Sequence, residues 1–77
     1  MAGLVKHSIT IAGHRTSFSL EEPFWHEVKA IAAREGVSLS QLVTQLDKRR
    51  EPGVNLSSCL RVFVLKDVLE RADARHH

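Results

Sequence analysis

Two stretches near the start of the chain alternate between hydrophobic and polar residues over most of their length. Residues 4–11 read LVKHSITI and residues 14–21 read HRTSFSLE. Because the side chains of a strand point alternately to its two faces, each stretch predicts a strand with one apolar and one polar face. Between them, Ala12-Gly13 is typical of a two-residue hairpin turn, in which Gly13 supplies the positive φ.

A single register of this hairpin sorts both strands at once. Pairing Ile11 with His14 gathers the apolar residues on one face, for example Val5 opposite Leu20, and leaves the polar residues on the other. A slip by one residue would mix the two faces, so the register is strongly specified. We therefore predict a hairpin over residues 4–20.

Helical spacing begins directly after the second strand. The apolar residues of this stretch recur every three or four positions, namely Phe24, Val28, Ile31 and Ala32. Pro23 suits the first turn of a helix and Gly36 suits its end, which predicts a helix over residues 22–35.

A second helix is predicted over residues 38–50. Ser38 followed three positions later by Gln41 forms the pattern of a capping box, and the apolar residues after it again have helical spacing. Pro52-Gly53 ends any continuous helix.

The segment that begins at Asn55 admits two interpretations. Residues 59–65, CLRVFVL, are rich in β-branched residues and fit a buried strand. The helical spacing of its apolar residues, with Asn55 as a cap, favours a helix over residues 55–72. Such a helix is apolar nearly all round for two turns, which predicts that another chain covers part of it.

The order of strand, helix and helix resembles the ribbon-helix-helix family, which includes the MetJ and Arc repressors. The resemblance covers residues 15–47, from the strand Phe18-Ser19-Leu20 through Gly36 to the turn Ser38-Leu39-Ser40. It implies an α+β fold, mostly helical, in a single domain of residues 1–77 that forms an intertwined homodimer. The N-terminal hairpin and the third helix would mark a short bacterial subgroup.

The same resemblance implies a function, that of a homodimeric DNA-binding protein and small transcriptional regulator. Two chains would pair their residues 15–20 and insert this ribbon in the major groove, where Arg15, Ser17 and Ser19 are the candidates for contact with bases. The candidates for anchoring phosphates are Lys6 and the helix start formed by Val37, Ser38, Leu39 and Ser40. Some members of the family carry a cation at the position of Glu21.

The size of the chain also points to self-association. Seventy-seven residues bury a small fraction of their surface, and the single cysteine, Cys59, excludes a disulfide within the chain. We expect a homodimer or a higher oligomer. The apolar residues expected at its interface are Phe18, Leu20, Leu42, Leu46, Leu60, Phe63 and Val64.

Charge and composition narrow the range of partners. A net charge of +2 and an isoelectric point near 9.1 permit binding to double-stranded DNA. The five histidines lack metal-ligand spacing, and the terminal His76-His77 is consistent with a remnant of a purification tag. We expect no metal and no cofactor. A membrane span and a signal peptide are not apparent either, so a cytoplasmic location is expected.

No arrangement of residues predicts an enzyme. His26 and Glu27 are adjacent on a helix and so point in different directions, and Ser57-Ser58-Cys59 has no histidine at a defined offset. His7 on the inner face is expected to be a hydrogen-bonded core histidine. The alternative function is a protein-interaction module, an antitoxin-like or scaffolding dimer that captures a protein partner with its apolar third helix.

Overall fold

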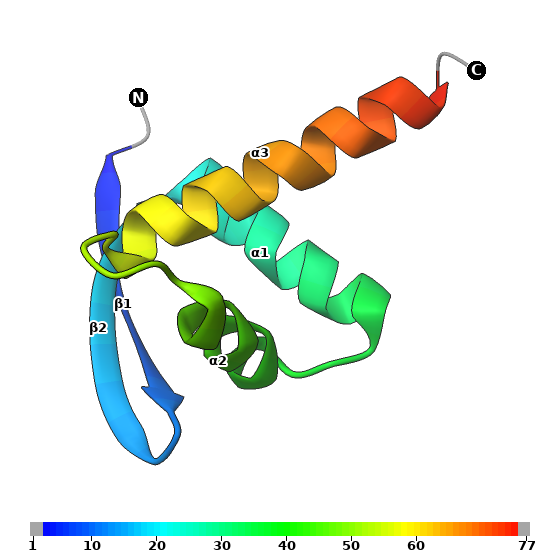
Figure 1. Ribbon diagram of the computed structural model, residues 1–77. Helices are drawn as coiled ribbons and strands as arrows, with labels where there is room; N and C mark the ends of the chain where they lie inside the picture. Colours follow the sequence, from blue (N-terminus) through cyan, green and yellow to red (C-terminus); the bar gives the residue numbers. More distant parts are fainter. Residues whose placement is uncertain (1–2, 76–77) are drawn as a thin grey trace.

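The computed structural model describes residues 3–75 and shows a two-stranded antiparallel sheet with three helices packed on one of its faces (Figure 1). The elements follow in the order β1 (Leu4–Ile11), β2 (His14–Glu21), α1 (Glu22–Glu35), α2 (Leu39–Arg49) and α3 (Leu56–Arg75). This is the predicted α+β architecture with an N-terminal hairpin and a third helix. The pair His76-His77 lies outside the described residues.

The hairpin closes through a type I′ turn. Ala12 and Gly13 both have positive φ, 50° and 82°, and this pair of left-handed conformations matches the twist of the two strands. The register is the predicted one, beginning with Ile11 opposite His14. The helices cover the apolar face, where Phe18 is buried, and leave the polar face exposed.

Local signals end α1 and begin α2. Gly36 adopts the left-handed conformation with φ of 71° and terminates α1. Ser38 then caps α2, because its hydroxyl accepts a hydrogen bond from the Gln41 N–H at 3.0 Å and the Gln41 side chain accepts one from the Ser38 N–H at 2.8 Å. This reciprocal pair is the predicted capping box.

The segment with two interpretations is a helix. Asn55 Oδ1 accepts a hydrogen bond from the Ser58 N–H at 2.8 Å and so satisfies one of the free donors at the start of α3. The helix runs from Leu56 to Arg75, past the predicted end at residue 72. Its C-terminal turns extend beyond the other helices (Figure 1).

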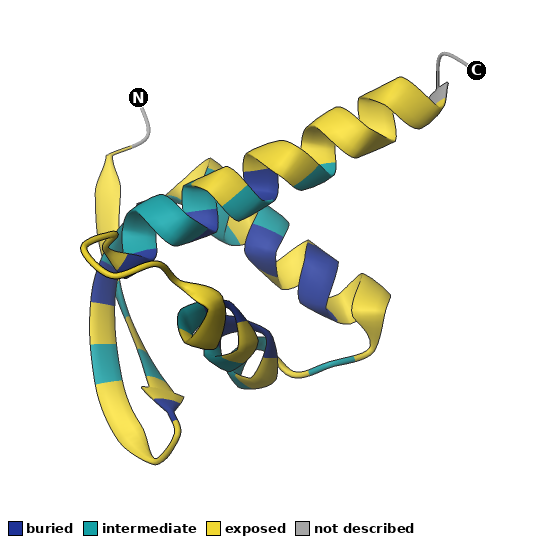
Figure 2. Cartoon of the chain, viewed as in Figure 1, coloured by how far each residue is buried: buried dark blue, intermediate teal, exposed yellow. Residues whose placement is uncertain are grey.

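The core lies between the sheet and the helices, and every element contributes to it. Its buried side chains are Ile11, Phe18, Leu20, Val28, Ile31, Ala32, Leu42, Val43, Leu46, Leu56, Leu60 and Val64. Buried positions are confined to the inner side of each element (Figure 2). Each chain therefore has an apolar core of its own.

Candidate nucleic-acid interface

The polar face of the hairpin is a narrow, exposed surface formed by one chain. Three pairs of opposed residues form most of it, Lys6 and Ser19, Ser8 and Ser17, Thr10 and Arg15, and the pair Leu4 and Glu21 continues the same face at the open end of the hairpin. In the three pairs, Ser19 is half-exposed and the other five residues are exposed. The Ser8 and Ser17 hydroxyl oxygens lie 3.2 Å apart, within hydrogen-bond distance. Hydroxyl groups thus occupy the centre of the polar face, with one cation toward each end.

Hydroxyl groups from the helices bind the two outer edges of the hairpin. Because the pair that flanks the turn is hydrogen-bonded, alternation along the ladder directs the backbone groups of Thr10 and Ser19 outward. Ser40 Oγ donates to the Thr10 carbonyl at 2.5 Å, and Ser57 Oγ donates to the Ser19 carbonyl at 2.6 Å. The joined residues are 30 and 38 positions apart, so no local pattern in the sequence predicted these contacts.

The turn that begins α2 lies beside the hairpin because Ser40 binds the edge of β1. Two of the predicted phosphate anchors already use their hydroxyl groups within the chain. The Ser40 hydroxyl donates its proton to the Thr10 carbonyl, and the Ser38 hydroxyl oxygen caps the helix. Val37 donates its N–H to the Ala32 carbonyl at 3.1 Å. Both hydroxyls of this turn are therefore engaged within the chain, and the side chains of Val37 and Leu39 pack against the core.

Backbone donors remain free at the same turn. Within residues 3–75, the N–H groups of Leu39 and Ser40 have no acceptor, as expected for the first turn of a helix. Such donors, together with the positive end of the helix dipole, favour an anion. Lys6, the other predicted phosphate anchor, lies on the polar face opposite Ser19.

Glu21, at the end of β2, is held by α3. Arg61 Nε donates to Glu21 Oε1 at 2.8 Å, and this hydrogen bond lowers the pKa of the Glu21 carboxyl. The guanidinium neutralises a carboxylate that would otherwise repel a phosphate next to the polar face. The sequence contained no signal for this pair, because its members are 40 positions apart.

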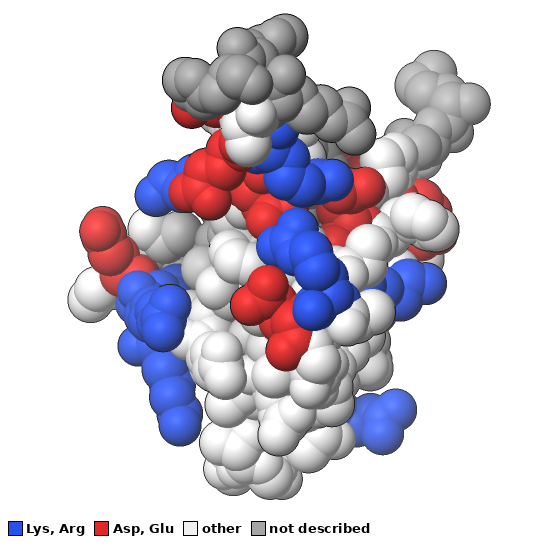
Figure 3. Space-filling model, turned by 90° about the vertical axis from the view of Figure 1, so that its right-hand side faces the viewer, with Lys and Arg blue, Asp and Glu red and all other residues white. Residues whose placement is uncertain are grey.

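Ion pairs hold α3 against α1. Arg34 donates to both carboxylate oxygens of Asp67, at 2.6 Å and 3.3 Å, and its hydrogen bond lowers the pKa of the Asp67 carboxyl. Arg71 pairs with Glu27 at 2.7 Å and with Asp67 at 2.9 Å. Basic and acidic side chains are intermixed at this end of the molecule (Figure 3), so this surface is not a uniformly basic one.

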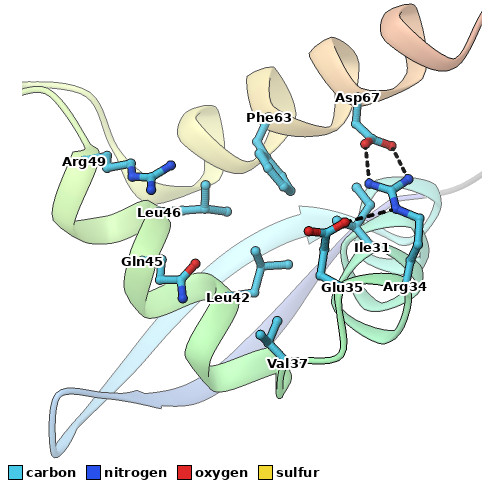
Figure 4. Close-up of a pocket in the computed structure, with 10 residues that line it drawn as sticks. All are labelled: Ile31, Arg34, Glu35, Val37, Leu42, Gln45, Leu46, Arg49, Phe63 and Asp67. Atoms are coloured by element: carbon cyan, nitrogen blue, oxygen red, sulfur yellow. Dashed lines mark hydrogen bonds and ion pairs between the residues drawn. The ribbon is translucent and has the colours of Figure 1, made fainter. Parts of the chain in front are cut away.

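A hollow of about 360 Å³ lies between the three helices. Its floor is apolar, with Leu42, Leu46 and Phe63 directed into it, and the Arg34–Asp67 pair borders one side (Figure 4). Its lining comes from the three helices and the loop between α1 and α2, and it contains none of the predicted base-contact residues.

The residues expected at a dimer interface are mostly inside the chain. Phe18, Leu20, Leu42, Leu46, Leu60 and Val64 are buried in its own core, and Phe63 is half-buried at the hollow. Different residues of α3 are exposed. Val62, Leu65, Val68 and Leu69 face away from the core, and we refer to these four as the outer stripe.

The side chains of His7 and Cys59 both pack against other parts of the chain. The His7 ring stacks on Trp25 with centroids 4.1 Å apart, and its Nε2 atom has no hydrogen-bond partner among the described residues, contrary to the expectation of a hydrogen-bonded histidine. Glu22 approaches this nitrogen to 3.7 Å. Cys59 is half-buried beside the Leu46 carbonyl, and burial raises the pKa of its thiol.

Residues 3–75 contain neither a candidate metal site nor a candidate membrane span. No three His, Cys, Asp or Glu side chains within residues 3–75 are grouped so that they could hold a metal ion. Over the same residues, no helix combines the length and the apolar character needed to cross a membrane.

Comparison with known proteins agrees with the fold. The chain is similar to a solved structure of an uncharacterized protein from Bordetella pertussis Tohama I, with 33% sequence identity and a TM-score of 0.78. The match covers 95% of this chain and 62% of the other, so this chain spans less than two thirds of that protein. No curated protein matches the sequence. The family model of the ribbon-helix-helix domain matches residues 4–68, and the chain belongs to the ribbon-helix-helix family.

Proposed function

We propose that this protein is a DNA-binding regulator that inserts the polar face of its hairpin in the major groove of duplex DNA. The observation that carries the proposal is the division of the hairpin into one face covered by the helices and one exposed face on which hydroxyls and two cations predominate. A two-stranded ribbon of this kind is what a major groove admits.

The width of the hairpin favours one chain as the source of the ribbon. Neighbouring strands lie about 4.8 Å apart, so joining β2 of two chains would create four strands with about 14 Å between the outermost backbones. A major groove is about 12 Å wide. The edge of β2 also approaches α3, which binds the Ser19 carbonyl. We therefore propose β1 and β2 of one chain as the ribbon, in place of the expected ribbon in which residues 15–20 of two chains pair.

The two cations of the polar face are spaced so that each can approach one of the two phosphate backbones that border the groove. Lys6 lies near the open end of the hairpin and Arg15 near its turn, on opposite strands. Four residues separate their positions along the ribbon, a distance of about 13 Å. Arg15 also has the fork of donors that recognises guanine edges, while Ser17 and Ser19 each supply one hydroxyl. Arg15 is expected to contribute most to binding.

The start of α2 supplies a second contact with the DNA backbone. Its free N–H groups, at Leu39 and Ser40, are fixed beside β1 by the hydrogen bond from Ser40 to Thr10. A phosphate bound there would set the depth and the direction of the ribbon without reading sequence.

The experiment compares the binding of single-residue variants to a labelled DNA duplex at 50 mM salt. Arg15→Ala is expected to weaken binding by about tenfold or more, because it removes a charge and a fork of donors. Ser17→Ala is expected to weaken it less, because it removes one hydroxyl. Lys29→Ala removes an equal charge from an exposed position of α1 and serves as the matched control. Folded variants that all bind as the parent does would refute the proposal, as would a parent that binds no DNA.

The second candidate function is a protein-interaction module, and the outer stripe of α3 is the observation that favours it. An exposed apolar surface on so small a protein is typical of an interaction site. The two candidates are separated by DNA binding at low salt, which only the first requires.

A further inference from the structure

On the basis of the DNA binding proposed above, we infer that Arg61 of α3 binds a phosphate of the DNA backbone and that Glu21 holds it in place for this contact. Arg61 Nε donates to Glu21 Oε1 at 2.8 Å. The two terminal nitrogens of the same guanidinium make no hydrogen bond within residues 3–75, and the Arg61 side chain is 33% exposed. Four of its five N–H donors are therefore free.

Two contacts from successive turns of α3 place Arg61 at the open end of the hairpin. Ser57 Oγ donates to the Ser19 carbonyl at 2.6 Å, and Arg61 binds Glu21 one helical turn further on. Ser57 and Arg61 share one side of α3, and Ser19 and Glu21 share one face of β2. Because Glu21 continues the polar face beyond Ser19, the Arg61 guanidinium lies at the border of that face.

The ion pair orients the guanidinium and leaves most of it available. A guanidinium is a planar fork of donors, and Glu21 takes the Nε donor, which leaves the terminal nitrogens for a second acceptor. The hydrogen bond from Arg61 lowers the pKa of the Glu21 carboxyl, so the group that holds the guanidinium is ionised at neutral pH. A side chain that is already held loses less conformational freedom on binding. A phosphate oxygen is an acceptor that fits the remaining fork.

Arg61 lies at the edge of the hairpin that the start of α2 does not reach. The free N–H groups of α2 lie beside β1 near Thr10, whereas Arg61 lies beside β2 at Glu21. Glu21 pairs with Leu4, six positions along β1 from Thr10, so the two sites are about 20 Å apart along the ribbon. A ribbon in the major groove has a phosphate backbone on each side. The start of α2 and Arg61 are thus placed to bind one backbone each.

The first test removes both charges of the pair, in Glu21→Gln/Arg61→Ala, and so leaves the net charge of the protein unchanged. If Arg61 only neutralised Glu21, this double variant would bind DNA as the parent does. It is instead expected to bind a labelled duplex about tenfold more weakly at 50 mM salt, because charged hydrogen bonds to phosphate are lost. Equal affinity of the parent and the double variant would overturn the inference.

Glu27→Gln/Arg71→Ala is the matched control. Arg71 Nη2 donates to Glu27 Oε1 at 2.7 Å, so this variant also removes an ion pair that joins α3 to another element. Arg71 is about 15 Å beyond Arg61 along α3, whose C-terminal turns lead away from the hairpin (Figure 1). The control is expected to bind DNA as the parent does. A loss of affinity equal to that of the first double variant would show an effect through the fold, against the inference.

Side-chain NMR of the parent tests the contact without a substitution at the site. The Nε–H signal of Arg61, assigned by its absence from Arg61→Ala, is expected to shift when duplex DNA is added, while the Arg71 signal stays in place. In Glu21→Ala the Arg61 signal is expected to broaden through exchange with water, because its acceptor is lost. An Arg61 signal that does not respond to DNA, or that stays sharp in Glu21→Ala, would contradict the inference.

The salt dependence of binding separates failure of this contact from failure of the proposed function. Glu21→Gln/Arg61→Ala is expected to lower the slope of log affinity against log salt by about one, as for the loss of one phosphate contact. A parent that binds duplex DNA and loses affinity in Arg15→Ala, but not in this double variant, would refute the Arg61 contact alone. A parent that binds no DNA at 50 mM salt would refute both.

Discussion

Ser57 Oγ donates a hydrogen bond of 2.6 Å to the carbonyl oxygen of Ser19. This contact joins the first turn of α3 to the outer edge of β2, directly beside the polar face of the hairpin. It satisfies a backbone acceptor that an edge strand would otherwise leave to water or to another chain. The hairpin is thereby fixed to the helices at β2, as the bond from Ser40 to Thr10 fixes it at β1.

Removal of the Ser57 hydroxyl should destabilise the fold. Ser57→Ala is expected to lower the free energy of unfolding by about 1 kcal/mol, because the Ser19 carbonyl loses its donor. Urea denaturation measures the change. Ser58→Ala is the control, since within residues 3–75 the Ser58 hydroxyl makes no hydrogen bond. Equal stability of the two variants would show that the edge contact contributes nothing.

The capping box at Ser38 should make a contribution of similar size. Ser38→Ala removes the acceptor for the Gln41 N–H and is expected to cost about 1 kcal/mol of unfolding free energy. Ser38→Asp retains an acceptor at the cap and is expected to restore most of the loss. If the alanine and aspartate variants have the same melting temperature, below that of the parent, then the loss of stability does not come from the cap.

The backbone of the hairpin turn is strained at Ala12, and another residue type at this position would relieve the strain. A φ of 50° is costly for alanine, whereas asparagine adopts it readily and is favoured at this position of a type I′ turn. Ala12→Asn is therefore expected to raise the free energy of unfolding by about 0.5–1 kcal/mol. Ala12→Val, with a β-branched side chain, is expected to lower it. Thermal melts that rank valine at or above asparagine would contradict the left-handed conformation.

The alternation of residues in the hairpin was sufficient to predict its register. Each strand buries one face only, so a slip would have exposed Phe18 and buried Ser17. The ends of α1 and α2 were predictable for a similar reason, because Gly36 and Ser38 act through bonds to residues a few positions away.

The orientation of α3 was not predictable from the sequence. Its first half is apolar nearly all round, so helical spacing alone does not distinguish the inward Leu60 and Val64 from the outward Val62 and Leu65. Contacts such as Glu21 with Arg61 depend on the packed tertiary structure and leave no periodic signal. The polar face was therefore predicted residue by residue, but its supports from α2 and α3 were not.

The Arg34–Asp67 pair should make the stability of the fold depend on pH in the acid range. The hydrogen bond from Arg34 holds the pKa of the Asp67 carboxyl below its value of 3.8 in a model peptide, although partial burial opposes the shift. A lowered pKa means that the stabilisation is fully present above about pH 4 and is lost as the pH falls through the folded-state value. At neutral pH, Asp67→Asn is expected to lower the melting temperature on the order of 5 °C.

The pH dependence of the melting temperature shows whether the lost ion pair causes the lower stability of Asp67→Asn. The difference in melting temperature between parent and Asp67→Asn is expected to be constant from pH 7 to pH 5 and to shrink below pH 4. Glu70→Gln neutralises another carboxylate of α3, one without an ion pair among the described residues, and is expected to change little. A difference that persists unchanged at pH 2 would point to a packing defect.

The central claim is that the polar face binds the phosphate-lined major groove, and the salt dependence of DNA binding tests it most directly. The measurement is the affinity of the parent and of Lys6→Ala for one labelled duplex between 50 and 200 mM salt. For the parent, the logarithm of the affinity is expected to fall linearly with the logarithm of salt concentration, and Lys6→Ala is expected to reduce that slope by about one. No binding at 50 mM, or the same slope for both proteins, would contradict the claim.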